Sequence, residues 1–373
     1  MYYKMKILVL SSHTPSLFWF RMDMMKNFLE LGHTVIAAAQ ESEQSWSDRF
    51  LEHGIEYRQV FVKRNGINPF SDLRTLKELK RLMKELNPDK VFAYQAKTIV
   101  YGSLAASHNR ITEVYPLVAG LGSVFRGEGL KNKILVKILE FQYRIAFKRS
   151  KKVIFQNEDD LNLFLNRNLL RQNQVEKING SGVNLEKFNS LSLPKEPAFL
   201  YIGRLIRDKG VMEYLEACRI LKSKYRSVRC MLVGPFDTNH SALQPEDLDY
   251  FIQNGIVEYF GEIDDVRPYI AQCSTYVLPS YHEGTPKTVL EAMAMGRAVI
   301  TTDAPGCRET VVEGVNGFLV EVKNVTQLAE KMELLMHNPQ LNERMGNEGL
   351  KMVRDKFDVR IVNADICVIM GIN

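Results

Sequence analysis

The amino-acid sequence predicts an α/β fold of two successive domains, each with a parallel β-sheet between layers of helices. Short apolar runs rich in β-branched and aromatic residues alternate with longer segments of helical periodicity. This alternation is typical of parallel βαβ units and of a doubly wound, Rossmann-like sheet. It stops once, around residues 190–199, and then starts again. A chain of 373 residues is also long enough for two ordinary hydrophobic cores.

The first half contains four apolar runs that predict strands: KILVL (6–10), TVIAAA (34–39), KVFAY (90–94) and KVIFQ (152–156). Two helical segments separate the first three of these runs. In FRMDMMKNFLELGH, apolar residues recur three and four apart until Gly32, a typical helix stop. SDLRTLKELKRLMKEL begins with Ser71 or Asp72 as a cap and keeps its leucines on one face.

The second half repeats the pattern after SLSLPKEPAF (190–199), where two prolines interrupt the periodicity and predict a linker. The strands expected here are AFLYIG (198–203), CMLVG (230–234), TYVLPS (275–280) and AVITTD (298–303). VMEYLEACRILKS and TVLEAMAMG are the clearest helical segments. We therefore expect a first domain at residues 1–190, a second at 191–357, and a tail of about 358–373 that can pack back on the first.

Composition indicates a soluble globular protein, with 45% apolar and 25% charged residues. Only four consecutive apolar residues follow Lys6, too few for a signal peptide, and no run of eighteen uncharged apolar residues is present to span a membrane. The five cysteines are scattered without a C-x-x-C pair. We expect reduced thiols in a cytoplasmic protein.

The net charge of +5 conceals an asymmetry between the two halves. Residues 1–190 carry 29 Lys and Arg against 19 Asp and Glu, or +10, whereas residues 191–373 carry 20 against 25, or −5. A basic half indicates an anionic partner, such as an acidic lipid, a phosphorylated substrate or a nucleic acid.

Two glutamates flank a turn in the segment YHEGTPKTVLEAMAMG. Glu283 follows the strand at 275–280, and ligands of open parallel sheets bind at the carboxyl ends of strands. The helix after Pro286 would direct its first amides toward an anion, most naturally a phosphate. Glu291 lies inside that helix and could accept two hydroxyl hydrogen bonds, as from a ribose. The alternative is a solvated loop glutamate followed by an ordinary helical one.

Basic residues follow the first strand of the second half in the same way. Gly203 allows a close backbone turn, and Arg204 and Lys209 lie in the loop RLIRDKG. Arginine suits bidentate contacts with phosphate, and lysine a point-charge contact. Both could therefore bind one diphosphate, although a solvated basic loop would show the same residues.

Together these motifs resemble a known enzyme family. The pattern G-R-x(4)-K-G, then Y-x-E-G-x-P-x(4)-E-A-M-A-x-G-x-A-V-I, then E-x-V-x-x-G-x-N-G-F-L-V is similar to the retaining glycosyltransferases of family 4. SGVNLEKF (181–188) resembles the segment at that family's domain junction. The resemblance covers nearly the whole chain. It implies the GT-B fold, in which two Rossmann-like domains face each other across a cleft.

The resemblance also assigns roles to residues. Arg204 and Lys209 would bind the diphosphate of a UDP-sugar donor, with Glu283 as the third catalytic residue. Glu291 would bind the ribose. The donor sugar would lie against Glu283 and the backbone of the turn and helix start, and the donor site would comprise Gly203, Arg204, Lys209, Glu283, Gly284, Thr285, Pro286, Lys287 and Glu291. Retention would proceed without a covalent protein intermediate, and neither a metal nor another cofactor would be required.

The first half is similar to bacterial enzymes that extend sugars linked to undecaprenyl diphosphate. The matching segments are FRM (20–22), NPFSDL (68–73), KTIVYGSLAA (97–106) and GLGS (120–123). The implied acceptor is a lipid-linked glycan in surface polysaccharide or glycoprotein assembly, and candidate contacts are His13, Lys97, Gly122, Ser123 and Arg126. One departure is the first loop, which reads SSHTPSLFWF where many relatives have a Gly-Gly turn.

The segment KNKILVKILEFQYRIAFKRSKK (131–152) has eight Lys or Arg against one Glu, and its apolar residues can form a broad face. A basic amphipathic helix is typical of proteins that bind a membrane surface. A core helix whose lysines and arginines are solvated would have the same sequence pattern. We expect a peripheral protein at the inner face of the cell membrane. Nucleic acid is not an expected partner, because no binding module is present.

Three other functions are weighed against transfer. A UDP-sugar 2-epimerase shares the two-domain plan, and a non-catalytic subunit would only bind UDP-sugar or lipid. A dehydrogenase is disfavoured, because no G-x-G-x-x-G follows either first strand.

Asp247 and Asp249 match the D-x-D motif of metal-dependent glycosyltransferases, but their place in a predicted first helical turn favours a capping role.

Overall fold

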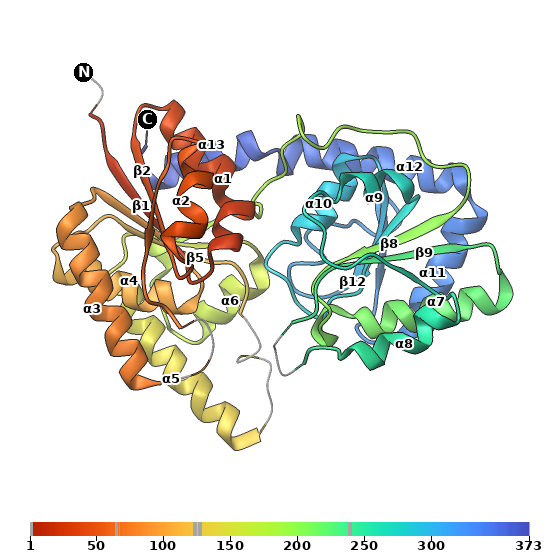
Figure 1. The fold of residues 1–373 in the computed structure, drawn as a ribbon, viewed down its shortest axis with the longest axis horizontal. Helices are drawn as coiled ribbons and strands as arrows, with labels where there is room; N and C mark the ends of the chain where they lie inside the picture. Colours follow the sequence, from red (N-terminus) through yellow and green to blue (C-terminus); the bar gives the residue numbers. More distant parts are fainter. Residues whose placement is uncertain are drawn as a thin grey trace. The chain divides into compact units, whose positions relative to one another are not determined.

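The computed structural model describes residues 3–63, 66, 68–121, 125, 129–237 and 241–372. The chain forms two compact units (Figure 1). The first comprises Met1–Ser181 together with Val359–Asn373, and the second comprises Gly182–Asp358. Each unit is built around its own parallel sheet.

The first unit has a sheet with the strand order β3-β2-β1-β4-β5-β6-β7, in which all neighbours are parallel. Its strands are β1 Lys6–Leu10, β2 Thr34–Ala39, β3 Glu56–Gln59, β4 Lys90–Tyr94, β5 Val114–Val118, β6 Val153–Phe155 and β7 Val175–Lys177. Its helices are α1 Thr14–Glu30, α2 Glu43–Leu51, α3 Pro69–Leu86, α4 Ala96–His108, α5 Gly129–Phe147, α6 Glu158–Asn166 and α13 Val359–Met370.

Alternation along β1 shows how this sheet is covered on both faces. Ile7 and Val9 pack in a cluster with residues of α1, α2 and α13. Leu8 and Leu10 point to the other face and pack with residues of α3 and α4. Successive strand residues point to opposite faces, so a strand buried on both sides is apolar throughout. This explains why KILVL shows no polar alternation.

The second unit has the strand order β10-β9-β8-β11-β12-β13, again all parallel. Its strands are β8 Ala198–Ile202, β9 Arg229–Val233, β10 Glu258–Tyr259, β11 Thr275–Leu278, β12 Ala298–Thr302 and β13 Gly317–Val320. Its helices are α7 Val211–Lys224, α8 Pro245–Gln253, α9 Arg267–Gln272, α10 Lys287–Ala294, α11 Val325–His337 and α12 Pro339–Met352. One continuous core cluster joins these helices to the sheet.

The boundary between the units lies at residues 181–182, and not at 190–191 as expected from the prolines. Val183 is fully buried in the core of the second unit, and its amide donates to the carbonyl of Phe357 at 2.9 Å. The segment at 182–190 therefore belongs to the second unit. After Asp358 the chain returns to the first unit, where Val362, Ile366 and Met370 of α13 join the core beside α1.

Both sheets have a topological switch point, where neighbouring strands lead into connections that leave in opposite directions. In the first unit it lies between β1 and β4, and in the second between β8 and β11. Ligands of open α/β sheets bind outside the carboxyl ends of the strands at such a point. The topology therefore marks one candidate binding position in each unit.

Candidate active site

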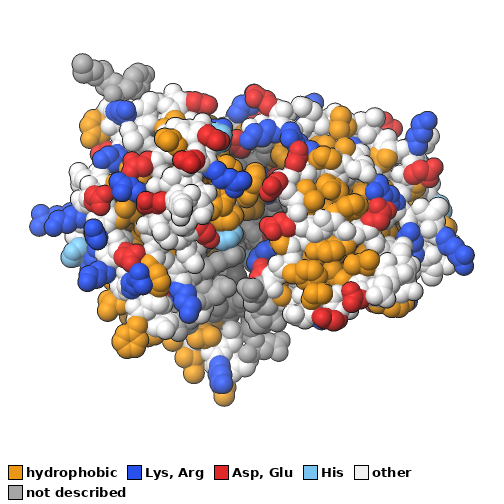
Figure 2. Space-filling model, viewed as in Figure 1, with side chains coloured by type: hydrophobic (Ala, Val, Ile, Leu, Met, Phe, Trp, Pro, Cys, Tyr) orange, Lys and Arg blue, Asp and Glu red, His pale blue; other side chains and the backbone are white. Residues whose placement is uncertain are grey.

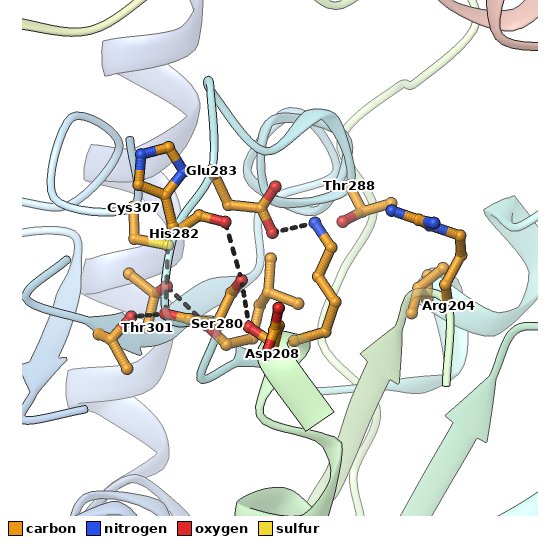
Figure 3. Close-up of polar contacts among 12 residues, drawn as sticks. Arg204, Asp208, Ser280, His282, Glu283, Thr288, Thr301 and Cys307 are labelled. Atoms are coloured by element: carbon orange, nitrogen blue, oxygen red, sulfur yellow. Dashed lines mark hydrogen bonds and ion pairs between the residues drawn. The ribbon is translucent and has the colours of Figure 1, made fainter. Parts of the chain in front are cut away.

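The switch point of the second unit brings together the two loops singled out in the sequence (Figure 3). Gly203 and Arg204 follow β8 and lead into a single 3₁₀ turn, Arg207–Lys209. The loop after β11 carries Glu283 and leads into α10. Residues far apart in the sequence thus share the carboxyl edge of two adjacent strands.

Backbone contacts fix these two loops to each other. The amide of Tyr281 donates to the carbonyl of Asp208 at 2.9 Å, and the Ser280 hydroxyl donates to the same carbonyl at 3.3 Å. Gly210 has φ +70°, and a Cβ at this position would lie 1.9 Å from the carbonyl oxygen of Pro279. Only glycine permits both this conformation and this approach. The close approach sets the position of Lys209 relative to the β11 loop.

Lys209 and Glu283 form an ion pair across the two loops. Their side chains are 21% and 11% exposed, so the pair is largely shielded from water. The backbone of Glu283 is held as well, because its amide donates to the carbonyl of Pro305 at 2.9 Å. The structure therefore brings into contact two residues that the sequence singled out separately. It also shows that Lys209 is neutralised by a carboxylate in this state.

Arg204 lies in the same site but pairs elsewhere. Its Nη1 is 2.6 Å from Oδ2 of Asp237, in the loop after β9, and its side chain is 41% exposed. Figure 3 shows the side chain of Arg204 directed toward Thr288, in the first turn of α10. Asp237 was missed in the sequence. It follows the strand CMLVG at its carboxyl end, so the rule applied to the other two loops would have found it.

Glu291 is the buried carboxylate of this site. It is 7% exposed and lies on α10, where Nζ of Lys287 is 3.9 Å from its Oε1. Burial raises the pKa of Glu291 to about 7, and the charge of Lys287 partly opposes that shift. The two glutamates are thus held by different lysines. Glu283 belongs to the loop and Glu291 to the helix.

The start of α10 is anchored to the sheet. The hydroxyl of Tyr276 on β11 is 2.7 Å from Oγ1 of Thr288 and 3.0 Å from the carbonyl oxygen of Ile202 at the end of β8. Tyr276 is fully buried. The predicted donor residues Gly284, Thr285 and Pro286 form the turn before the helix, and Lys287 is its first residue. The helix therefore begins at the switch point, where its amides can meet an anion.

The candidate acceptor residues lie in the first unit. His13 is the N-cap of α1, where its Nδ1 accepts from the amide of Ser16 at 3.3 Å. Nζ of Lys97 is 2.6 Å from Oδ1 of Asp72, and both side chains are mostly buried, so this pair joins α4 to α3. Gly122, Ser123 and Arg126 lie outside the described residues.

The D-x-D sequence lies in the first turns of α8. The carboxylate of Asp247 accepts from the amide of Gln244 at 2.8 Å, which is a capping contact. Its other oxygen lies 3.4 Å from Nη2 of Arg207. These contacts agree with the structural role that its position in the sequence favours.

Comparisons with known proteins fit this architecture. The family described as "Glycosyl transferase 4-like" matches residues 6–157, and "Glycosyl transferases group 1" matches residues 183–352. An N,N'-diacetylbacillosaminyl-diphospho-undecaprenol alpha-1,3-N-acetylgalactosaminyltransferase of Campylobacter jejuni is 32% identical over 352 residues, covering 90% of this chain and 91% of that protein. The capsular polysaccharide glycosyltransferase CapM of Staphylococcus aureus is 28% identical, covering 82% and 83%.

A solved structure shows the same arrangement of elements. Anabaena HepE in complex with UDP and glucose superposes with a TM-score of 0.78 at 18% identity, covering 98% of this chain and 99% of HepE. At this level of identity the likeness bears on the fold alone. The family matches span both units of the chain and the relatives are similar over most of their length. The chain therefore belongs to the group 1, family-4-like glycosyltransferases and has the GT-B fold.

Proposed function

We propose that this glycosyltransferase moves a hexose or N-acetylhexosamine from a UDP-sugar to a lipid-diphosphate-linked glycan, with retention of configuration. The observation that carries the proposal is the site at the β8/β11 switch point, where three cations, three carboxylates and a helix start converge. The Campylobacter relative, whose name specifies a diphospho-undecaprenol acceptor, supports the acceptor class. CapM supports a place in surface polysaccharide assembly.

The site suits the departure of a nucleoside diphosphate. Lys209 and Arg204, with the first amides of α10, supply positive charge where the leaving group becomes more negative. Their present partners, Glu283 and Asp237, must share or release them when a diphosphate binds. Because these groups provide the charge, the proposed reaction requires no metal. Glu291 would accept hydrogen bonds from the ribose hydroxyls.

Retention follows if the acceptor hydroxyl attacks from the face that the diphosphate leaves, without a covalent protein intermediate, and passes its proton to the departing diphosphate. Glu283 would then orient the donor sugar. Released from Lys209 by the diphosphate, its carboxylate could accept hydrogen bonds from sugar hydroxyls. The remaining work of the protein is to hold both substrates in line.

The proposal is tested with a panel of UDP-sugars and short-chain lipid-diphosphate monosaccharides as acceptors. We expect one donor to give a new glycosidic bond whose anomeric configuration, read by NMR, matches that of the donor. A new sugar nucleotide without a glycosidic product would identify a 2-epimerase. UDP-sugar binding without turnover on any acceptor would identify a non-catalytic subunit, and an inverted anomer would contradict retention.

A membrane-linked acceptor requires the enzyme to reach a lipid surface. We propose that α5 makes this contact, because one of its faces is buried in the unit and the other exposes apolar side chains. Its inner face, including Tyr143 and Phe147, is buried, so the helix is held in the unit. Its outer face has a shallow apolar depression lined by Leu130, Lys133, Ile134, Lys137, Ile138 and Phe141. Leu130, Ile134 and Phe141 are 80%, 61% and 60% exposed. Among the described residues, no helix combines the length and apolarity needed to cross a bilayer.

The start of α3 extends the apolar surface. Phe70 and Leu73 are 86% and 66% exposed. The helix is joined to α4 by the Lys97–Asp72 pair, and α4 is joined to α5 by a hydrogen bond of 3.4 Å from Gln142 to Tyr101. Figure 2 shows hydrophobic side chains with a Lys or Arg among them at the lower margin of the first unit, where α5 lies in Figure 1. Apolar side chains ringed by lysines suit an anionic leaflet.

The double change Ile134→Asp and Phe141→Asp is expected to lower binding to anionic liposomes by about 100-fold or more. Each apolar side chain would otherwise contribute roughly 1.5–3 kcal/mol on burial in lipid. Flotation with phosphatidylglycerol vesicles measures the effect, and Leu51→Asp is the matched control, since Leu51 is 67% exposed on α2. Equal losses in both proteins, or no loss in the double variant, would rule out α5 as the membrane surface.

A further inference from the structure

The switch point of the first unit contains a polar cluster that the donor site does not use. Ser11 and Ser12 follow β1, and Gln95 follows the neighbouring strand β4. Oε1 of Gln95 accepts from the Ser11 hydroxyl at 3.0 Å, from the Ser12 amide at 2.9 Å and from the Ser12 hydroxyl at 2.5 Å. One side chain therefore ties the two strand ends together at the position where this fold binds ligands.

Gln95 also has a strained backbone, with φ 73° and ψ 141°. This region is sparsely populated for residues with a side chain and is retained where the surroundings enforce it, often at ligand sites. The strain allows Gln95 to face the β1 loop while α4 starts at the next residue. The surrounding structure therefore enforces the position of Gln95 in the cluster.

Arg21 contacts Tyr94, the residue that precedes Gln95, and the side chains of Tyr94 and Gln95 both donate to Oγ of Ser16. Arg21 is 2% exposed on α1, and its Cζ lies 5.1 Å from the centroid of the Tyr94 ring. The Tyr94 hydroxyl in turn donates to Oγ of Ser16, in the first turn of α1, at 3.1 Å. Long helical side chains lean toward the helix N-terminus. The guanidinium is therefore held near the carboxyl end of β4, the strand that pairs with β1 at the switch point.

Within the described part of the chain, Arg21 has no hydrogen bond or ion pair. Its Nε is buried without an acceptor. Burial lowers the pKa of Arg21 to about 10, and the Tyr94 hydroxyl is the one group that opposes this shift. At physiological pH the guanidinium remains charged. A buried charge without a counter-ion is costly to keep, because the energy lost on leaving water is not returned.

The start of α1 does not supply further charge for a ligand. The amide of Thr14 donates to Oε2 of Glu41 at 2.7 Å, and the amide of Ser16 donates to His13. Position 15 is a proline and has no amide hydrogen. The helix terminus is therefore occupied, and Glu41 adds a negative charge there. Among the described residues of the first unit, Arg21 is the buried Lys or Arg without an ion-pair partner, because Lys90, the other one, pairs with Glu113.

We propose that Arg21 binds a phosphate of the acceptor's diphosphate at the β1/β4 switch point. This rests on the proposed function, which supplies a diphosphate-linked acceptor. A guanidinium offers phosphate a planar, bidentate set of donors. Further hydroxyl donors are Ser12, which belongs to the cluster, and Ser16, which contacts Tyr94 and Gln95. The donor's diphosphate has its own cations in the second unit, Arg204 and Lys209.

The test uses the full chain with saturating UDP, so that the donor site is filled, and farnesyl diphosphate as the probe. Calorimetry on the wild type should show a further binding event. In Arg21→Met its affinity should fall about 10- to 100-fold, the loss expected for a charge-assisted contact. Lys26→Gln removes a positive charge from the same helix and should leave the event unchanged. Arg21→Lys should fall between wild type and Arg21→Met.

Two further measurements separate binding from structure. If Arg21 serves a ligand, Arg21→Met should not lower the melting temperature of the free protein, because it removes an unpaired buried charge. Its affinity for UDP alone should equal that of the wild type; weaker UDP binding would assign Arg21 to the donor and overturn the proposal. No second event in the wild type, or an equal one in Arg21→Met, would also overturn it. Neither result depends on Lys209, whose replacement by alanine tests the donor site separately.

Discussion

Lys209→Ala is expected to lower kcat by about 10²- to 10³-fold, the usual loss when one donor to a developing negative charge is removed. The lysine is held at the end of a loop fixed by Gly210 and Asp208, with its side chain 21% exposed. A cation in such a shielded position interacts more strongly with a diphosphate than one in water. Initial rates at saturating donor and acceptor measure the effect.

The matched control is Arg207→Ala. Arg207 belongs to the same 3₁₀ turn, its side chain is 53% exposed, and its partner is Asp247 of α8 and not Glu283. It should retain most of the wild-type rate. A similar loss in both variants would indicate a disturbed loop instead of a missing cation. An unchanged rate in a folded Lys209→Ala protein would remove Lys209 from the stabilisation of the leaving group.

The Lys209–Glu283 pair allows a second check on the same residue. Glu283→Gln frees Lys209 but removes a proposed contact with the donor sugar, so each single change should slow the reaction. If both residues act through their mutual contact, the double variant should lose less than the product of the single losses. Fully multiplicative losses would show that each acts on the substrate independently.

The sequence was sufficient for the part of the site that follows the strand-end rule. Lys209 and Glu283 were predicted to share a crevice because each follows a buried strand, and the sheet order places those strands side by side. The partners that these side chains choose were not predictable. Arg204 pairs with Asp237 because β9 lies next to β8 on the other side, and this adjacency depends on strand order.

The fold was predicted where apolar runs are strong and uninterrupted. β3 (EYRQ) was missed because an edge strand needs little apolar character. β5 was missed as well, because it contains Pro116. Proline has no amide hydrogen to donate to a neighbouring strand and therefore argues against an inner strand. β5 nevertheless lies between β4 and β6. The start of α3 was placed too late. Asn68 caps the helix before Pro69, and not Ser71 or Asp72 as expected.

Glu291→Gln is expected to stabilise the free protein at alkaline pH and to weaken its binding of UDP. The folded-state pKa of about 7 lies above the ordinary value of 4.5, so the native state holds the proton more tightly than the unfolded chain. Ionisation therefore costs stability, beginning above pH 4.5 and complete above pH 7. Glutamine has no such cost. The variant should gain up to about 3 kcal/mol at pH 8, at roughly 1.36 kcal/mol per pKa unit, and nothing at pH 4.

Urea unfolding at pH 4, 6 and 8 measures this difference, and Glu330→Gln, an exposed position on α11, is the control. A gain that does not grow with pH would contradict an ionising Glu291.

The same substitution should have the opposite effect on UDP binding, which it should weaken. A carboxylate can accept two ribose hydroxyl hydrogen bonds, whereas the amide of glutamine offers one oxygen and two donors. UDP should therefore bind the wild type more tightly as the pH rises through 7 and Glu291 ionises, while Glu291→Gln should bind about tenfold more weakly and without that rise. Calorimetric titration between pH 6 and 8 distinguishes the two. A residue that destabilises the free protein yet strengthens nucleotide binding is retained for the ligand, whereas equal UDP affinity in both proteins would reduce Glu291 to a buried helical glutamate.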